Sequence, residues 1–518
     1  MTLRTDLGRL LTMKATEFAD QPFVTFAPAG DTYTYAAFNT DVNRIAHGLM
    51  DQGIGVGDYV CLMLPNSLEY LATTYALKKL GAVEVSINAS IKGPALARML
   101  ALTNAKTLIA GADAIASVKP IIDDVPELET IIVSESFEAA VAAFPDHTVL
   151  PFQSILSDQT SDLAADIRDT DVQAILFTSG TTGVSKGCME SHRYAIDTAE
   201  GCVDAFDLTG DDVSYAPYPL FHIGGCYYDV LPMMLVGGRV IIRPGFSVSN
   251  FWPEVSRFGA TWFMMLGSVQ QLLWTAPPCP EEASHAVRIC WGTPIPIPRA
   301  QFEDRFKLRL YPGGGYGSTD SGWVVMPQLE HAGGRVRDNW QVAVVDADDE
   351  LLPPNTIGEL VIRPREPGIM SYGYFGMPEK TAETRRNLWF HTGDFAMLDE
   401  DGLFTFKGRM NDRLRVRGEM VSAFEVEEIA AVHDGVEECA VIGVPDGTGE
   451  EDLVLFVVAK PGSDLAEAGL RVYCATRMAK FMVPKYIQFI QTMPRTPTDK
   501  PAKQALLGIF RGDAGAFD

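Results

Sequence analysis

The sequence lacks the cysteine spacing of a disulfide framework or a structural zinc site. Its eight cysteines stand apart from one another, and no Cys-x-x-Cys pair occurs that would supply zinc ligands. Basic side chains are also scarce, because 42 lysines and arginines accompany 67 acids and leave a formal net charge of −25. A surface of that sign repels nucleic acids and anionic membranes. We therefore expect a protein of a reducing compartment without a nucleic-acid partner.

Long hydrophobic runs are absent as well. No uninterrupted apolar stretch approaches the roughly 20 residues needed to cross a bilayer, which predicts no membrane-spanning segment. The first residues, MTLRTDLGRLLTMKATEFADQPF, carry acids early and have no long apolar core, and the last residues hold no peroxisomal tripeptide. Secretory and peroxisomal signals need those features. We expect a cytoplasmic protein.

The first half of the chain alternates strand-like and helix-like patterns. The segments Tyr59–Leu64, Ser67–Leu80 and Val83–Asn88 give the order strand, helix, strand, with Gly81 as a helix stop. That order requires parallel strands covered by helices on both faces. The same rhythm recurs up to residue 291, so the pattern predicts an α/β fold with doubly wound sheets.

The pattern of predicted strands and helices changes in the second half of the chain. From about Gly333, short strands and turns predict a small β-barrel-like region that closes the large domain. Beyond Asp412, helices near 423–432 and 470–479 and strands near 440–443, 454–458 and 486–490 predict a small α+β domain. A chain of 518 residues is too long for one small core. We expect a large N-terminal domain over residues 1–411 and a small C-terminal domain over residues 412–518.

A loop rich in glycine and hydroxyl groups follows the strand-like run 174–176. Its sequence, FTSGTTGVSKG over residues 177–187, combines bare backbone amides, hydroxyl donors and one lysine, as polyphosphate binding requires. The spacing is not that of a Walker loop, and taken alone the segment is also compatible with a flexible surface loop. The candidate phosphate-binding residues are Thr178, Ser179, Gly180, Thr181, Thr182, Gly183 and Lys186.

This loop resembles the phosphate-binding signature of the adenylate-forming superfamily, which includes acyl-CoA synthetases, peptide-synthetase adenylation domains and beetle luciferases. Ser185 stands where that family usually has proline, a change that costs loop stiffness more than chemistry. Further motifs follow in the family's order from about residue 30 to Lys503. Segments such as FWPEVSRFGATWF and MAKFMVPKYIQF look most like the bacterial crotonobetaine/carnitine-CoA ligase group.

The resemblance implies a second set of nucleotide contacts in GGGYGSTD, residues 313–320. Tyr316 would stack on the purine, and Thr319 would hydrogen-bond a phosphate during catalysis. Asp320, usually a glutamate, would hold Mg²⁺ with a reach shorter by one methylene. The neighbouring residues implied to contact the nucleotide are Gly315, Gly317 and Ser318.

Two later motifs resemble the family's ribose and hinge segments. In WFHTGD, Asp394 would accept hydrogen bonds from the ribose hydroxyls. In FKGRMND, Arg409 would make another nucleotide contact, and Asp412 would be the hinge of a mobile C-terminal domain. Taken alone, Asp394 and Arg409 are also compatible with a surface charge pair on a β-turn.

The remaining motifs concern the acid and the thiol. The histidine of PLFHIGG, His222, would line or gate the acyl pocket, although a buried structural histidine is the simpler reading of that segment alone. In PRTPTDKPAK, Lys500 would bind the carboxylate and the α-phosphate as they react. Asp499 replaces the glycine that usually precedes this lysine. In RVRGEMV, the coenzyme A contacts would be Arg417, Gly418 and Glu419.

Aromatic residues near the pocket motifs bear on the choice of acid. Tyr227, Tyr228, Asp229, Trp291 and Trp323 together would suit a quaternary ammonium or sulfonium group, through cation–π attraction and one carboxylate. Packing of the core is the simpler interpretation, because aromatic side chains are usually buried for their area alone. The two tryptophans would shorten a tunnel, which favours a compact acid over a long-chain fatty acid.

These expectations describe an AMP-forming acid–CoA ligase. It would use Mg²⁺, ATP and coenzyme A to activate a small carboxylic acid, with homodimer formation as a possibility. One alternative is an adenylation enzyme that loads a carrier protein in trans. The other is a catalytically quiet nucleotide-binding regulator, which the departures at Ser185, Asp320 and Asp499 keep open and the intact Lys186, Asp394 and Lys500 disfavour.

Overall fold

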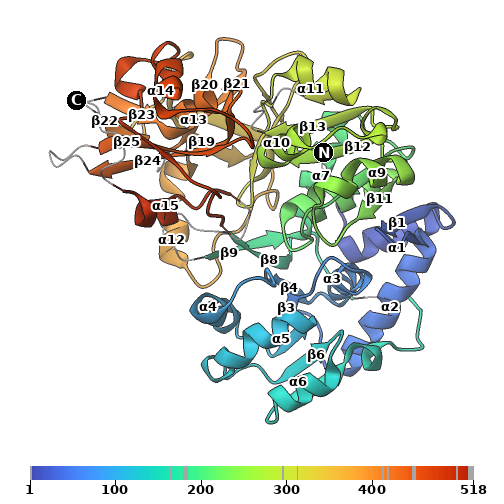
Figure 1. Ribbon diagram of the computed structural model, residues 1–518. Coiled ribbons are helices and arrows are strands. Elements are labelled where there is room, and N and C mark those ends of the chain that lie inside the picture. Colours follow the sequence, from blue (N-terminus) through green and yellow to red (C-terminus); the bar gives the residue numbers. More distant parts are fainter. Residues whose placement is uncertain are drawn as a thin grey trace.

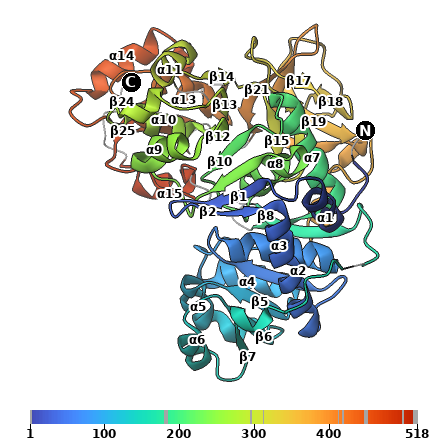
Figure 2. The same ribbon diagram turned by 90° about the vertical axis from the view of Figure 1, so that its right-hand side faces the viewer.

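Two seven-stranded sheets form the body of the protein (Figures 1 and 2). The computed structural model describes residues 3–163, 165–178, 185–293, 297–311, 313–410, 413–416, 419–445, 451–496 and 500–511. Within these residues, the figures show one sheet in a lower lobe and the other in the upper part of the molecule, beside the C-terminal elements.

The first sheet has the strand order β7-β6-β5-β3-β4-β8-β9 and is parallel except for the antiparallel pair β8–β9. Its strands are β3 (Tyr59–Met63), β4 (Val83–Ser86), β5 (Thr107–Ala110), β6 (Thr130–Val133), β7 (Thr148–Pro151), β8 (Val172–Thr178) and β9 (Lys186–Ser191). The helices of this part are α2 (Tyr35–Asp51), α3 (Leu68–Leu80), α4 (Gly93–Thr103), α5 (Ala112–Val118) and α6 (Phe137–Ala143).

Helix α3 shows how local sequence signals produce this architecture. The Ser67 hydroxyl accepts a hydrogen bond from the Tyr70 N–H at 3.2 Å and caps the start. Gly81, with a φ of 72°, adopts the left-handed conformation that ends the helix. Every residue from Tyr70 to Leu80 is buried, because the helix lies inside the body of the protein. The predicted strand–helix–strand unit is confirmed, since β3 and β4 pair in parallel.

The second sheet has the order β14-β13-β12-β10-β11-β1-β2 and is parallel except for the edge pair β1–β2. Its strands are β1 (Pro22–Phe26), β2 (Asp31–Thr34), β10 (Val213–Ala216), β11 (Arg239–Ile242), β12 (Trp262–Leu266), β13 (Ile289–Thr293) and β14 (Arg309–Tyr311). The helices are α1 (Leu7–Glu17), α7 (His192–Phe206), α8 (Leu231–Val236), α9 (Val248–Phe258), α10 (Gly267–Thr275) and α11 (Arg299–Phe306).

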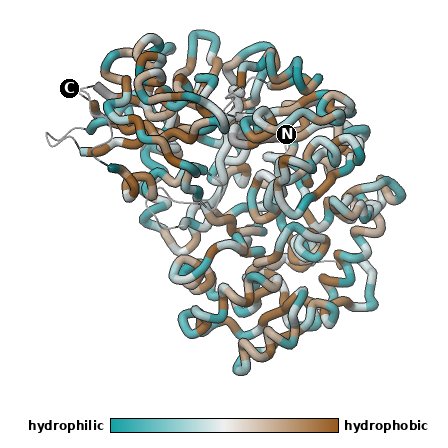
Figure 3. The backbone as a smooth tube through the Cα atoms, viewed as in Figure 1, coloured by the Kyte–Doolittle hydropathy of each residue, from teal (hydrophilic) through white to brown (hydrophobic). Residues whose placement is uncertain are grey.

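The largest hydrophobic core cluster joins the two sheets through the helices between them. It contains Leu71 of α3, Leu176 of β8, Ile196 of α7 and Met233 of α8. Figure 3 shows the hydrophobic stretches along the inner strands and helices. One apolar core therefore fixes the strand ends of the first sheet against the second, and the predicted motifs lie near those ends.

Two antiparallel sheets follow in the chain and share one core around Trp340 and Phe404. The first comprises β15 (Tyr316–Ser318), β16 (Gly322–Met326) and β17 (Arg335–Val336). The second comprises β18 (Trp340–Val345), β19 (Gly358–Pro364), β20 (Phe390–Leu398) and β21 (Phe404–Arg409), with α12 (Pro378–Glu383) between β19 and β20.

The C-terminal elements form a small α+β unit, as expected. A two-stranded ribbon, β22 (Arg413–Val416) and β23 (Glu419–Ser422), precedes a sheet of β24 (Val436–Pro445), β25 (Glu451–Ala459) and β26 (Tyr486–Phe489). Its helices are α13 (Ala423–Ala431), α14 (Glu467–Ala475) and α15 (Lys503–Ile509). Asp412, the expected domain boundary, lies outside the described residues. No helix in the described part of the chain is both long and apolar enough to cross a membrane.

Candidate active site

The β8–β9 hairpin brings the two ends of the phosphate loop together. Thr178 pairs with Lys186 across the hairpin, and the Thr178 hydroxyl donates to the Lys186 carbonyl at 3.4 Å. The Lys186 ammonium lies 3.3 Å from the Tyr374 hydroxyl and 4.4 Å from the centre of the Tyr374 ring. The predicted residues Ser179, Gly180, Thr181, Thr182 and Gly183 lie outside the described residues. The hairpin thus places one lysine at the mouth of the predicted loop.

Asp320 lies opposite Lys186, in the turn between β15 and β16. The Cys188 thiol donates to its Oδ1 at 3.7 Å, and the Ser371 N–H donates to its carbonyl at 3.0 Å. Burial raises the pKa of the Asp320 carboxyl, while hydrogen bonding to Tyr374 and the nearby Lys186 ammonium lower it. Sequence motifs therefore predicted two residues, an acid and a base, that the fold places in one electrostatic environment.

Three neighbours of this pair gave no signal in the sequence. Tyr374 contacts Lys186, and the Arg385 guanidinium donates to the Ser371 carbonyl close to Asp320. Glu190 of β9 is fully buried, and within the described part of the chain neither of its carboxylate oxygens has a hydrogen-bond partner. Burial, followed by the nearby Asp320 carboxylate, raises the pKa of Glu190 well above its usual value. We have no physical account of why a glutamate occupies this buried position.

Tyr316, Asp394 and Arg409 converge from three strands. The Tyr316 hydroxyl donates to Asp394 Oδ2 at 2.6 Å, and Arg409 Nε lies 3.6 Å from Asp394 Oδ1. Asp394 and Arg409 are cross-strand partners in β20 and β21, so their backbone register fixes this contact. Burial and the Asp394 carboxylate raise the pKa of Tyr316 well above its usual value. The cluster offers a buried ring, a carboxylate and a cation side by side.

The glycines of the same motif are needed for close packing. A Cβ on Gly315 would lie 3.0 Å from the Trp291 ring, and a Cβ on Gly317 would lie 2.5 Å from the Gly322 carbonyl oxygen. The Ser318 N–H donates to the Ser321 hydroxyl, and the Thr319 carbonyl accepts from the Tyr194 hydroxyl at 2.9 Å. The motif therefore runs directly over the aromatic residues that the sequence suggested for the acid pocket.

His222 lies just before the π-helical turn Gly224–Val230. Its Nδ1 accepts a hydrogen bond from the Gly224 N–H at 3.1 Å, so a neutral ring carries its proton on Nε2. Burial, reinforced by the Lys500 ammonium, lowers the pKa of His222 to about 4. The C-terminal lysine is thus close enough to act on the histidine electrostatically. Of the residues that the motifs assigned to the reacting end of the acid, Lys500 thus contributes to the electrostatic environment of His222.

Lys500 is carried by a loop whose ends are tied to each other. The Thr496 N–H donates to the Lys500 carbonyl at 2.7 Å, and the Lys500 N–H donates to the Thr496 hydroxyl at 3.1 Å. Asp499 lies outside the described residues. The two hydrogen bonds between Thr496 and Lys500 anchor the backbone at the position of this lysine.

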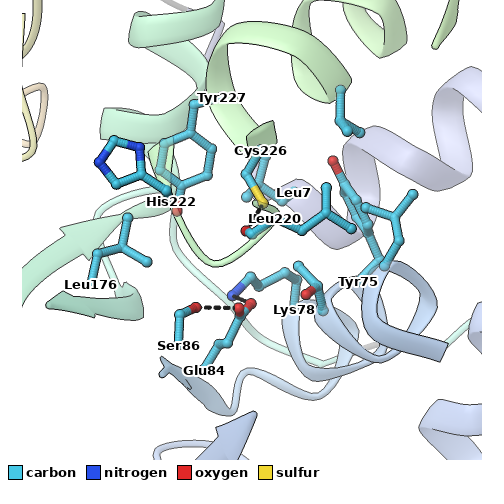
Figure 4. Close-up of a pocket in the computed structure, with 13 residues that line it drawn as sticks. Leu7, Tyr75, Lys78, Glu84, Ser86, Leu176, Leu220, His222, Cys226 and Tyr227 are labelled. Carbon is cyan, nitrogen blue, oxygen red and sulfur yellow. Dashed lines mark hydrogen bonds and ion pairs between the residues drawn. The ribbon is translucent and has the colours of Figure 1, made fainter. Parts of the chain in front are cut away.

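A small cavity of about 20 Å³ lies beside His222, Cys226 and Tyr227 (Figure 4). A buried ion pair borders it: Lys78 Nζ lies 2.9 Å from Glu84 Oε2 and donates to the Gln173 carbonyl at 2.7 Å. A cavity of this size holds about one water molecule. It is too small for a substrate. Through this cavity, the Lys78–Glu84 ion pair lies next to the segment that carries His222.

The five residues suggested for the acid pocket divide into two groups. Tyr228, Trp291 and Trp323 gather beside the glycine motif, since Trp323 lies 4.9 Å from Tyr228 and 5.0 Å from Trp291, measured between ring centroids. Tyr227 instead accepts a hydrogen bond from the Gln173 side chain at 2.7 Å. The Ser214 hydroxyl of β10 donates to Asp229 at 2.8 Å.

The environment of Asp229 also matters for its charge. The residue is fully buried, and its Oδ2 has no hydrogen-bond partner among the described residues. Burial raises the pKa of Asp229 to about 8, against the single opposing hydrogen bond from Ser214. At neutral pH the side chain is therefore largely protonated and supplies little negative charge to a cation.

The residues predicted for the thiol substrate can be placed only in part. Arg417 and Gly418 lie outside the described residues, as does the hinge residue Asp412. Glu419 begins β23, which pairs with β22 in an antiparallel ribbon. The roles of Asp412, Arg417, Gly418 and Glu419 therefore remain predictions.

Comparison with known proteins identifies this arrangement as that of an ATP-dependent adenylate-forming ligase. The family described as AMP-binding enzyme matches residues 11–375, and the AMP-binding enzyme C-terminal domain matches residues 425–500. The chain belongs to the AMP-binding enzyme family. The expected superfamily and the expected combination of a large N-terminal and a small C-terminal domain are confirmed.

Curated relatives cover nearly the whole chain. A crotonobetaine/carnitine–CoA ligase of Salmonella agona (strain SL483) is 29% identical over 491 residues, which is 92% of this chain and 93% of that protein. The fatty acid–[acyl-carrier-protein] ligase ScoC of Streptomyces coeruleorubidus is 30% identical over 504 residues, covering 94% and 93% of the two chains.

Solved structures agree with this assignment. The anthranilate CoA ligase AuaEII in complex with anthranoyl-AMP has a TM-score of 0.88 and 25% identity, with 98% of both chains covered. A fatty acyl CoA synthetase of Mycobacterium tuberculosis has a TM-score of 0.74 and 27% identity, with 97% of both chains covered. The relatives thus share a reaction class while their named acids differ.

Proposed function

We propose that this protein is an AMP-forming acid–CoA ligase for a small, compact carboxylic acid. The observation that carries the proposal is the cluster of Tyr316, Asp394 and Arg409, because it joins three residues of separate nucleotide motifs, and the electrostatic effect of Lys500 on His222 supports it from the acid end. The cluster forms the other end of the proposed site. The named activities of similar proteins, which are acid–thiol ligases, support the same reaction.

In the first half-reaction, a carboxylate oxygen of the acid bonds to the α-phosphorus of ATP and pyrophosphate leaves. Both reactants are anionic, so positive charge must be concentrated where they meet. Lys186 and the phosphate loop would hold the departing phosphates. Asp320 offers the hard oxygen ligand that suits Mg²⁺, which would neutralise phosphate charge when bound. Lys500 would contact the carboxylate and the α-phosphate together.

His222 contributes in a different way. Because its pKa is lowered to about 4, the ring is neutral at physiological pH and adds no positive charge. Its Nδ1 already accepts from the Gly224 N–H, which leaves Nε2–H as a donor. We infer that His222 lines the acid pocket and orients the carboxylate, while Lys500 supplies the charge.

In the second half-reaction, the coenzyme A thiol would attack the adenylate carbonyl and release AMP. The small domain, residues 412–518, would turn about Asp412, withdraw Lys500 and present Arg417, Gly418 and Glu419 to the pantetheine arm. Separate chemical steps on one site explain why a mobile domain is useful. The resemblance to the family supports this step.

For the acid, we propose that Tyr228, Trp291 and Trp323 form the wall of the pocket. They lie against Gly315 and Gly317, beside the predicted adenylate site, and their bulk leaves room for a short acid. A quaternary ammonium or sulfonium group could bind to these ring faces. That part of the proposal depends on the aromatic residues alone, because Asp229 is largely protonated and bonded to Ser214.

A second candidate is transfer of the acyl group to a carrier protein. The name of the Streptomyces relative, a fatty acid–[acyl-carrier-protein] ligase, is the specific observation in its favour. Both candidates share the adenylation step and differ in the thiol. A catalytically quiet regulator would bind ATP without acid-dependent chemistry.

Acid-dependent exchange of labelled pyrophosphate into ATP tests the proposal. The panel should include carnitine, crotonobetaine, dimethylsulfoniopropionate, butyrate, benzoate and anthranilate, each with and without coenzyme A. The proposal predicts exchange with at least one compact acid and AMP release that requires coenzyme A. Exchange without coenzyme A-dependent AMP release would favour a carrier protein. Tight ATP binding with no exchange for any acid would favour the regulator.

A further inference from the structure

Four ionisable side chains, Asp349, Glu359, Arg386 and His391, cluster beside the bulged segment of β20 that carries Asp394. The possible ligand atoms of Asp349, Glu359 and His391 lie within 4.8 Å of one another, a spacing that could suit a metal ion. The Arg386 guanidinium lies among them, however: its Nη2 is 3.3 Å from Asp349 Oδ1, 3.8 Å from Glu359 Oε2 and 3.0 Å from His391 Nδ1. The cluster therefore already contains its own cation, and it is best described as an ion-pair network.

Glu359 connects this network to the backbone of the bulged segment of β20. Its Oε1 accepts from the Gly393 N–H at 3.2 Å, and its Oε2 lies 2.9 Å from His391 Nδ1. Both side chains are buried, with residue exposures of 8% for Glu359 and 6% for His391. Loss of either contact would leave a buried polar group unsatisfied in a low-dielectric environment, which costs free energy. A buried carboxylate with two such partners therefore holds both of them in place.

The bulged segment of β20 around Gly393 has an irregular backbone that these contacts support. Gly393 has a φ of +71°, a conformation available to glycine at little cost. The Thr392 hydroxyl donates to the Leu360 carbonyl at 2.7 Å and accepts from the Asp394 N–H at 3.1 Å. Hydrogen bonds to β19 thus hold Thr392 and Gly393, and the Thr392 hydroxyl in turn holds the Asp394 N–H. The direction of the Asp394 carboxylate, which meets Tyr316, depends on these contacts.

We propose that Glu359 and His391 are positioning residues for nucleotide binding, which act through the bulged segment of β20 at Gly393 on the carboxylate of Asp394. Neither needs to touch the nucleotide. The inference rests on the proposed function, in which Asp394 accepts hydrogen bonds from the ribose hydroxyls. It predicts a selective defect: loss of the network should weaken the part of ATP binding that depends on those hydroxyls.

The test compares ATP with 2′,3′-dideoxy-ATP, using calorimetric binding to the full-length protein. Asp394→Asn should weaken ATP binding about 10- to 100-fold, as expected for hydrogen bonds to a charged group, and should barely affect the dideoxy nucleotide. Glu359→Leu should weaken ATP binding about tenfold and dideoxy-ATP less than about twofold. Glu359→Gln keeps an acceptor for the Gly393 N–H and should lose less than Glu359→Leu. Glu400→Gln, at an exposed glutamate beyond β20, is the matched control and should change neither affinity.

The outcomes separate the inference from the function on which it rests. If Asp394→Asn weakens both nucleotides equally, the role of Asp394 in the proposed function is wrong. If Asp394→Asn behaves as expected but Glu359→Leu weakens both nucleotides equally, Glu359 has only a general structural role and the inference is overturned. If Glu359→Leu does not fold, His391→Gln carries the test, and it should show the same selective loss for ATP. An unchanged ratio of the two affinities in His391→Gln would also overturn the inference.

Discussion

Replacement of Lys500 by alanine tests the arrangement at the reacting end of the acid. Lys500 acts on His222 from the small domain, and it is the cation that we propose to bridge the carboxylate and the α-phosphate. Removing one preorganised donor at a developing charge typically costs about 100- to 1,000-fold in rate, or ~3–4 kcal/mol. We therefore expect Lys500→Ala to slow acid-dependent pyrophosphate exchange by that factor. Thioester formation from a supplied acyl-adenylate and coenzyme A should be largely spared.

The same variant has a second readout that does not depend on turnover. The Lys500 ammonium disfavours the protonated form of His222 and so contributes to its lowered pKa of about 4. Lys500→Ala should therefore raise the pKa of His222, although burial will keep it below the ordinary value. Magnetic resonance of protein labelled at histidine, with His222→Gln to assign the signal, measures this shift. Lys500→Arg keeps the charge and is the matched control.

Two results would refute the reasoning. An equal loss in both half-reactions would show that Lys500 is needed in the thioester step as well, contrary to a domain that turns away. An unchanged pKa of His222 would show that the lysine does not approach the histidine in solution. Either result would leave the internal contacts of the cluster of Tyr316, Asp394 and Arg409 as described, because those contacts join these three residues to one another.

Three further predictions concern the residues around the site. Burial raises the pKa of Asp229 to about 8, so the folded state binds a proton that the unfolded state loses near pH 4, and this contribution to stability falls as pH rises between about 4 and 8. Urea unfolding should show that Asp229→Asn removes this fall, and an unchanged pH dependence would contradict it. Lys78→Met leaves Glu84 buried without its cation and should lower the free energy of unfolding by about 3–5 kcal/mol, whereas Lys78→Met with Glu84→Leu should recover part of it. No recovery would argue against the ion pair as the cause. Trp323→Phe should enlarge the acid pocket, raise KM for a compact acid and admit longer acids without changing KM for ATP, and equal changes in both KM values would place Trp323 outside the pocket.

Much of the fold could be predicted because its signals are local. Helix α3 begins at the Ser67 cap and ends at Gly81, as the pattern indicated. The boundaries of β24 were less accessible: the hydrophobic pattern predicted 440–443, but the strand runs from Val436 to Pro445. Its first half holds Glu437, Glu438 and Cys439 at consecutive partly exposed positions, so a search for apolar runs does not detect it.

The motifs predicted which residues belong to the nucleotide site, but the contacts between those residues depend on the fold. Tyr316 and Asp394 occur in separate motifs, and the fold joins them at 2.6 Å. The acid pocket was harder, because adjacent residues in the sequence point to different elements. Tyr227, Tyr228 and Asp229 lie on a π-helical turn, whose wider winding changes the direction of successive side chains from that of an α-helix. Tyr228 faces Trp323 while Asp229 bonds to β10, so the expected cage of aromatic rings and one carboxylate does not form as a unit.

The charges of the side chains differ between the ribose end and the acid end of the site. The protein carries a formal net charge of −25 and must bring two anionic substrates together. Positive charge is therefore required at the point of reaction, where it offsets the repulsion between the substrates, and an unpaired charge placed elsewhere would be costly. Arg409 lies against Asp394, so the two opposite charges offset each other at the ribose end, and Arg409 mainly orients the Asp394 carboxylate. At the acid end, burial and Lys500 keep His222 neutral. A charged histidine would hold the carboxylate in the ground state as strongly as in the transition state, which lowers KM without raising kcat. In the mechanism that we propose, a neutral histidine and a lysine from a mobile domain would instead confine the extra charge to the conformation in which the adenylate forms.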